Sequence, residues 1–238
     1  MTLRQVVELV RPQLGRAAAR MWAAATSREW YLTWLATCHD LVRATAPLLA
    51  EAVTESVRRG EGRLAAYFAD QVRAEFGHDA WLRADYAAAG GDPAELAQRV
   101  PAPAAARLVG AQHYWLRHAH PVALTGHIAV LEWHPPAPGL AAVLVRRTGL
   151  PAAAFSTLRR HAELDAAHGA ELADLLAGMA LTGPQQRLVT TSALTTAHGL
   201  VGLMTDLGGP RWHTGPASTS SASTPASSPT SSAPCWNP

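Results

Sequence analysis

Long segments with apolar residues spaced three and four positions apart constrain this chain more than any other feature. Such spacing lines one face of an α-helix, and no segment shows the period-two alternation of a half-buried strand. Short runs rich in Gly and Pro separate the segments, which extend over about residues 3–25, 28–59, 64–89, 103–133, 140–147, 152–180 and 184–207. The pattern predicts an all-α bundle of about seven helices.

The chain is expected to form a single domain followed by a tail. It has 238 residues, of which 48% are hydrophobic, and this suits one globular domain with a sizeable core. After Gly208-Gly209-Pro210 the composition changes to Ser, Thr, Pro and Ala, which cannot bury enough apolar surface to order a segment. We predict a helical domain over residues 1–210 and a disordered tail over residues 211–238.

Composition also limits the classes of partner. The net charge is +2, and no basic run is interleaved with aromatic residues, so we expect no nucleic-acid partner. No apolar run reaches the ~20 residues of a membrane span, and the N-terminus lacks the apolar segment of a secretion signal. The two cysteines, Cys38 and Cys235, have no evident pairing, which fits a reducing compartment. A cytoplasmic location is expected.

The stretch His161-Ala-Glu-Leu-Asp165-Ala-Ala-His168 carries the first chemical signal. Residues at i, i+4 and i+7 project from one face of a helix. Histidine nitrogen and carboxylate oxygen are ligands of first-row transition metals such as iron or manganese. An ordinary polar face in a histidine-rich protein gives the same pattern, so partners on other helices decide between the two interpretations.

Such partners occur on two other predicted helices. Glu75 and His78 form an i, i+3 pair, a pattern that also arises often by chance. Glu132 follows the apolar run Ile128-Ala-Val-Leu131, and a carboxylate in such surroundings needs a partner if it is buried. The alternative is that Glu132 marks the solvated end of a helix before Pro135.

A further carboxylate is expected from the second helix. If residues 28–59 and 64–89 pack antiparallel across a turn at Gly60, positions 40–44 lie level with positions 75–78. Asp40 is the candidate at that height, with His39 beside it, although Asp40 can equally be an ordinary polar residue of the helix. Six or seven ligands suit two metal ions rather than one, and four carboxylates would neutralise two ferrous ions.

The combined motifs resemble the haem-oxygenase-like diiron oxidases and oxygenases, relatives of the thiaminase II (TenA) and PqqC proteins. The resemblance covers about residues 28–205. Ferritin-like bundles use two Glu-x-x-His motifs, whereas here His-x-x-x-Asp-x-x-His replaces the second, which disfavours that topology. The matching residues are Glu75-x-x-His78-Asp79, Trp81-Leu82 and Asp85, then His118-Ala-His120-Pro121, Gly126 and Glu132, and finally His161, Asp165 and His168.

The resemblance implies a haem-oxygenase-like helical bundle that binds two Fe(II) ions per chain and takes O2 as co-substrate. The implied metal-ligating and catalytic residues are Glu75, His78, Glu132, His161, Asp165 and His168. The family usually adds a Glu from the second helix, a place that Asp40 would fill here. The implied activity is oxidation of a small organic substrate by N-oxygenation, C–C cleavage or desaturation, in specialised metabolism. Three points stay open: the identity of the electron donor, the choice between an Fe/Fe and a Mn/Fe pair, and whether the chain forms a homodimer.

Other functions of the same fold remain alternatives. A haem-binding protein needs an axial histidine and none of the carboxylates. A metal-free enzyme related to TenA or PqqC needs a nucleophilic cysteine, for which only Cys38 is available. A non-catalytic bundle is the third alternative.

Four histidines before Glu132 are expected to be structural rather than ligands: His113, His118, His120 and His127. Tyr86 and Tyr114 are expected to line a substrate cavity.

Overall fold

The computed structural model describes residues 1–137 and 139–209, and only the backbone of residues 165–167. Within these residues the chain forms ten α-helices, one short 3-10 helix and no strand, so the predicted fold class is confirmed. The predicted tail, residues 211–238, lies outside the described part. The helices are α1 (Leu3–Ala23), α2 (Arg28–Arg58), α3 (Gly62–Glu75), α4 (His78–Ala88), α5 (Pro93–Gln98), α6 (Pro103–His118), α7 (Ala123–Glu132), α8 (Leu140–Thr148), η1 (Ala152–Phe155), α9 (Ser156–Ala177) and α10 (Gly183–Gly208).

Side-chain caps define where the long helices begin. Ser27 accepts a hydrogen bond from the backbone N–H of Trp30 at the start of α2, as its position in the sequence suggests. Thr2 forms a capping box with Gln5 at the start of α1, and Thr182 does the same at the start of α10. Both α1 and α2 continue through an internal proline.

Two segments predicted as single helices are each divided in two. Residues 64–89 form α3 and α4, separated at Gly77, whose φ of +89° is accessible to glycine without steric cost. Residues 103–133 form α6 and α7, separated at Pro121. Proline lacks an N–H and disfavours helical geometry in the residue before it. The expectation of one continuous helix over residues 64–89 was therefore wrong. Pro121, which was expected to kink the helical region 103–133, lies at a complete break between two helices.

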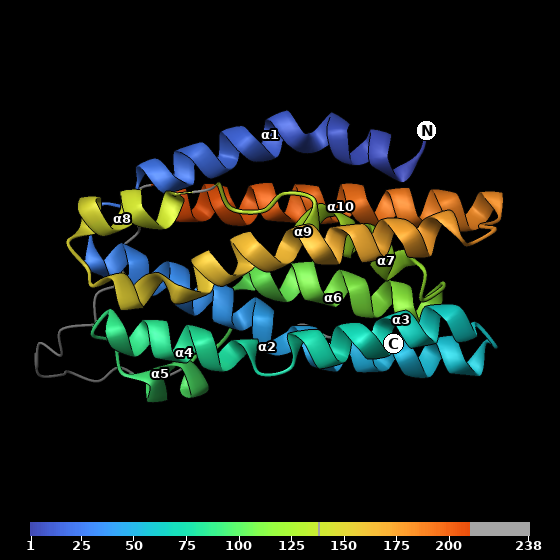
Figure 1. Ribbon diagram of the computed structural model, residues 1–238, viewed down its shortest axis with the longest axis horizontal. Coiled ribbons are helices and arrows are strands. Elements are labelled where there is room, and N and C mark those ends of the chain that lie inside the picture. The colour runs from blue at the N-terminus through green and yellow to red at the C-terminus, as the bar shows by residue number, and fades with distance from the viewer. Residues whose placement is uncertain (138, 210–238) are drawn as a thin grey trace, which may run out of the picture.

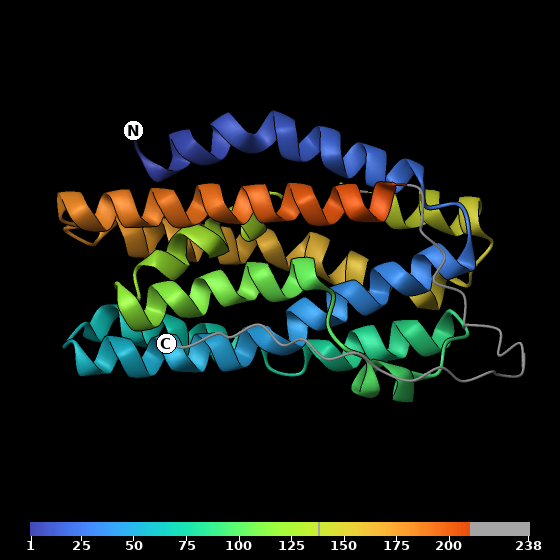
Figure 2. The same cartoon turned by 180° about the vertical axis from the view of Figure 1, so that it is seen from behind.

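The helices lie roughly along one long axis, with α1 packed on α10 and α2 packed on α3 and α4 (Figure 1). The view from behind shows α10 as a long helix that passes α6 and α7 (Figure 2). A Cβ atom at Gly126 of α7 would lie 2.1 Å from the carbonyl oxygen of Val189 in α10. Glycine at this position therefore allows the two backbones to approach, which fixes α7 against the bundle.

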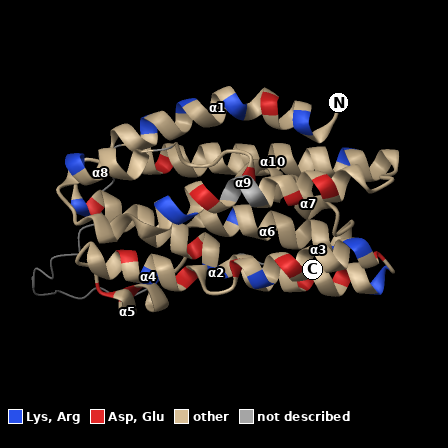
Figure 3. Cartoon of the chain, viewed as in Figure 1, with Lys and Arg blue, Asp and Glu red and all other residues tan. Residues whose placement is uncertain are grey.

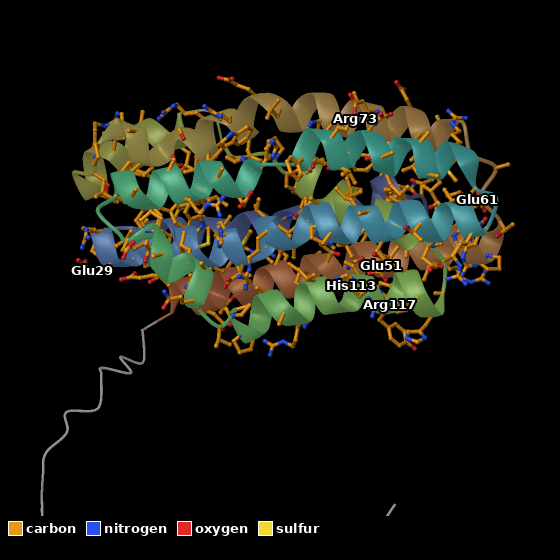
Figure 4. All side chains as sticks on the ribbon, turned by 90° about the horizontal axis from the view of Figure 1, so that it is seen from below. Glu29, Glu51, Glu61, Arg73, His113 and Arg117 are labelled. Carbon is orange, nitrogen blue, oxygen red and sulfur yellow. The ribbon has the colours of Figure 1, made fainter. Side chains whose placement is uncertain are left out.

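Charged residues of both signs are interspersed over the helices (Figure 3). One cluster joins α2 to α6: Glu51 accepts hydrogen bonds from Arg117 at 2.6 and 3.1 Å and lies 2.7 Å from Nδ1 of His113 (Figure 4). The hydrogen bond from Arg117 lowers the pKa of Glu51. None of the described helices is long and apolar enough to cross a bilayer.

Candidate metal centre

Three predicted ligands from three helices meet inside the bundle. Glu75 is the last residue of α3, Glu132 is the last residue of α7, and His168 lies within α9. One ligand atom from each lies within 4.8 Å of the others. Nδ1 of His168 is 3.6 Å from Oε2 of Glu132 and 3.9 Å from Oε1 of Glu75. Among the described side chains, these three form the group that could hold a metal ion.

Two further predicted ligands lie on the other side of Glu75. Its second oxygen, Oε2, is 3.1 Å from Nδ1 of His78. The ring of His161 stands nearly perpendicular to that of His78, with the ring centroids 5.4 Å apart. Nδ1 of His161 donates to the carbonyl of Thr157 at 3.0 Å, which leaves its Nε2 free to accept a metal ion. Glu75 therefore has one donor set at each of its two oxygens.

The two carboxylates are held in an electrostatically unfavourable place. Each lies at the C-terminal end of a helix, where the helix dipole is negative, and the side chains of Glu75 and Glu132 are only 12% and 14% exposed. Burial alone would raise the pKa of Glu75, but the close contact with His78 and the charges of nearby histidines outweigh it and lower that pKa. The site is therefore an anionic one that favours cations.

The surroundings of His168 favour its protonated form in the metal-free site. Its interaction with Glu132 raises the pKa of His168 above the usual value, against the opposing effect of burial. A protonated imidazole beside two carboxylates partly compensates their charge. A metal cation would do so more completely, because it takes the place of the proton on the ligand nitrogen.

Unsatisfied buried atoms show that these residues fit a metal. Within the described part of the chain, Oε2 of Glu132 and Nδ1 of His78 are buried without a hydrogen-bond partner. Bonds from such ligands to zinc are about 2.1 Å long, so two ligands of one first-row metal ion lie about 3–4 Å apart. The distances around Glu75 fall in this range. The buried hydroxyl of Tyr67 also has no hydrogen-bond partner there. Burial and the nearby carboxylates raise its pKa.

Residues of α4 position the ligands of α9. The buried carboxylate of Asp85 accepts hydrogen bonds from the backbone N–H groups of Ser156 and Thr157, which are otherwise unsatisfied at a helix start. The carbonyl of Thr157 then orients His161. Sequence reasoning did not find this role of Asp85, because its partners lie more than 70 residues further along the chain.

An indole ring fixes His78. Trp81 of α4 stacks on the imidazole with the ring centroids 3.9 Å apart and the planes inclined by 27°. The guanidinium carbon of Arg160 lies over the Trp81 ring, 4.5 Å from the ring centroid. A tryptophan one turn after a ligand was part of the sequence motif, but its contact with the ligand could be read only from the structure.

Of the two other predicted ligands, Asp40 is not brought into this group. Asp40 pairs with Arg99 at 3.1 Å and accepts a hydrogen bond from the N–H of Ala102 at 3.2 Å. On α2 the next residue, Leu41, lines the internal cavity instead; successive helical residues point about 100° apart, so Asp40 faces the segment between α5 and α6. The side chain of Asp165 lies outside the described residues, and its role as a ligand stays a prediction.

An apolar cavity of about 770 Å³ adjoins the centre. Glu75, Glu132 and His161 contribute to its wall, and α1, α2, α7 and α10 supply mostly apolar side chains. The expectation that Tyr86 and Tyr114 line a cavity was wrong. Tyr114 is 57% exposed, and the hydroxyl of Tyr86 donates to Glu95 at 3.0 Å.

The fold and the donor set define a haem-oxygenase-like helical bundle with a candidate metal centre. The profile of a family described as iron-containing redox enzymes matches residues 32–198, which is more than half of the chain. The protein belongs to this family of iron-containing redox enzymes.

Solved structures agree with the fold. A domain of unknown function with a heme oxygenase-like fold from Shewanella denitrificans OS217 has a TM-score of 0.74 at 15% identity, over 86% of this chain and 89% of that chain. A TenA homolog from Pseudomonas syringae pv. tomato str. DC3000 has a TM-score of 0.66 at 14% identity, over 86% and 91%. No curated protein shows significant similarity to the chain. The predicted haem-oxygenase-like fold is thus confirmed.

Proposed function

We propose that the protein is a non-haem diiron oxidase or oxygenase that uses O2 to oxidise a small organic molecule. The position of Glu75 carries this proposal, because its two oxygens face different donor sets. Oε1 lies 3.9 Å from Nδ1 of His168, which is itself 3.6 Å from Glu132. Oε2 lies 3.1 Å from Nδ1 of His78, whose ring centroid is 5.4 Å from that of His161. A carboxylate between two such sets suits a pair of metal ions better than a single ion.

The residues of the site bind, orient and shield. When bound, iron supplies one-electron redox chemistry and a place for O2, which the side chains themselves lack. Trp81 holds the ring of His78, and the carbonyl of Thr157 keeps Nε2 of His161 free for a metal. The apolar cavity wall excludes water from the substrate. N-oxygenation, C–C cleavage and desaturation are all compatible with this arrangement, and the electron donor is unassigned.

A metal-free, TenA-like reaction is the second candidate, which the structural likeness to a TenA homolog keeps in view. It would need a reactive cysteine, and Cys38 does line the cavity. Burial, assisted by the charge of Asp40, raises the pKa of Cys38 to about 12. The thiol is therefore protonated at neutral pH and a weak nucleophile, which favours the iron-dependent reaction.

The test compares iron oxidation by O2 in matched variants. Full-length protein is loaded anaerobically with Fe(II), mixed with O2 and followed by iron absorbance and O2 consumption. The wild type should oxidise its iron at least tenfold faster than Glu75→Gln, which keeps the side-chain volume but removes the charge between the donor sets. Glu163→Gln, an exposed position on the same helix as His168, should match the wild type. Equal rates in Glu75→Gln and the wild type would refute the proposal.

A further inference from the structure

The cavity holds a buried imidazole that the metal centre does not use. His127 of α7 lines the cavity and is only 8% exposed. Its Nδ1 lies 3.0 Å from the hydroxyl oxygen of Thr196 in α10. Among the described residues its Nε2 has no hydrogen-bond partner. The ring is buried, but Nε2 is not fully shielded from solvent, so it opens to the cavity, where a bound molecule can reach it.

A chain of buried hydrogen bonds determines which nitrogen of His127 carries the proton. Ser192 donates to Oε1 of Gln112 at 3.1 Å, and Nε2 of Gln112 donates to the hydroxyl oxygen of Thr196 at 3.3 Å. Among the described residues, His127 Nδ1 is the remaining neighbour that can accept the Thr196 hydroxyl proton. Nδ1 therefore acts as an acceptor, and the ring proton resides on Nε2.

Burial also keeps this ring neutral. It lowers the pKa of His127 to about 4, and no charged neighbour contributes to the shift. A neutral imidazole whose Nδ1 accepts a hydrogen bond has one proton to give, at Nε2. His127 therefore presents a single uncharged donor to an otherwise apolar space.

Most other polar groups of the cavity wall outside the metal centre are already engaged, although the buried, uncharged hydroxyl of Thr157 has no partner among the described residues. Arg11 donates two hydrogen bonds to Glu8 at 2.7 and 2.9 Å. Thr45 donates to a carbonyl of its own helix, and Gln71 donates to Glu171. Nδ1 of His134 is bonded to the carbonyl of Val130, so its buried Nε2 offers a lone pair and no charge. Apart from the metal centre, the described wall has no unpaired charge for an ionic ligand.

We infer that the cavity binds an uncharged, largely apolar molecule with one acceptor oxygen, which receives a hydrogen bond from Nε2–H of His127. The inference deepens the proposed function by naming the chemical class of its substrate. Only the statement that the bound molecule is the substrate rests on that function. His127 precedes Glu132 by five residues, or about 7.5 Å along the helix. The anchored oxygen thus lies away from the ligands, and the apolar part of the molecule faces them.

Three probes of equal chain length test the inference: 2-decanone, decanoate and decylamine. Binding to the full-length protein without added iron is followed by tryptophan fluorescence, because Trp22 and Trp34 line the cavity. The ketone should bind at least tenfold more tightly than decanoate. Decylamine is the control for the metal-free centre, because the carboxylates of Glu75 and Glu132 in the cavity wall favour its ammonium group. Equal or tighter binding of decanoate would overturn the inference.

Variants connect this binding to His127. His127→Phe, which removes the donor, should weaken ketone binding about tenfold, and His127→Gln, which keeps an N–H donor, should restore part of the loss. Thr45→Val is the matched control in the same wall and should bind as the wild type does. Unchanged binding in His127→Phe would contradict the inference.

The result is independent of the iron chemistry. Ketone binding without iron oxidation by O2 would refute the proposed function and leave the substrate class standing. Iron oxidation without selective ketone binding would refute only the substrate class.

Discussion

Glu132 has surroundings that are unfavourable for a carboxylate without a bound cation. It lies at the negative end of α7, close to a second buried carboxylate, and one of its oxygens has no hydrogen-bond partner among the described residues. Each of these features costs free energy in the metal-free protein. Proteins tolerate such local costs at functional sites, and a bound cation would remove this one.

Replacing Glu132 by Gln should therefore separate stability from metal binding. We expect the metal-free variant to be about 1 kcal/mol more stable than the wild type, because one charge at the negative helix end is removed. Urea denaturation measures this change, and iron analysis after anaerobic loading should show a loss of bound metal. Glu163→Gln, in an exposed position of α9, should change neither property. A destabilised variant that still binds the full amount of iron would show that our account of Glu132 is incorrect.

His127 should make the stability of the protein depend on pH. Burial lowers its pKa from 6.5 to about 4 in the folded state, so between these values the unfolded chain binds the extra proton. The free energy of unfolding therefore falls as the pH falls from 6.5 towards 4, and His127 contributes about 3 kcal/mol to this fall.

Denaturation of His127→Gln across this pH range tests the assignment. The variant should lose much of the acid-side slope, whereas His113→Gln, at the surface cluster with Glu51, should keep it. A slope that is identical in His127→Gln and the wild type would mean that His127 is not the residue responsible.

At the scale of elements, the break between α3 and α4 forms half of the centre. Glu75 ends one helix and His78 begins the next, with Gly77 between them at a φ of +89°. The sequence predicted that these two residues meet, but on one continuous helix. The observed turn allows Oε2 and Nδ1 to approach within 3.1 Å from two different helix ends.

Gly77→Ala tests the importance of this turn. An L-residue in the left-handed region costs about 1 kcal/mol, and a Cβ at this position meets no atom within 4 Å, so strain alone should lower the stability. The variant should also bind iron more weakly, because relief of the strain moves His78 away from Glu75. Gly149→Ala has a similar φ of +70° at the end of α8 and should lose stability without loss of iron. Equal iron affinity in both variants would contradict this role of the turn.

The sequence was sufficient for the class of fold, and three of the residues that it proposed as ligands lie close together in the structure, for physical reasons. Helical periodicity is local, so the segments around Leu64 and Leu158 could be assigned from their own residues. The motif around His161 and His168 is equally local. Contacts between distant segments could not be predicted, and Asp40 illustrates this: its height along α2 was estimated from packing, but its direction depended on Arg99 and on the N–H of Ala102.

At the scale of the whole molecule, the centre joins α3, α7 and α9, which are far apart in the chain. A ligand that binds only the folded state stabilises the entire fold. Fe(II) at 100 times its dissociation constant should raise the free energy of unfolding by about 2.7 kcal/mol, measurable as an increase in Tm under anaerobic conditions. Mg²⁺, which favours oxygen ligands and near-ideal octahedral geometry, should give a smaller increase. An equal increase with both ions would argue against a centre built from imidazoles.

The most direct measurement is an anaerobic titration of the metal-free protein with Fe(II), read by bound-iron analysis and Mössbauer spectroscopy. The two donor sets at Glu75 predict two Fe(II) ions per chain, and Glu75→Gln should bind fewer than two. A wild-type endpoint of one iron per chain, or of none, would contradict the diiron account.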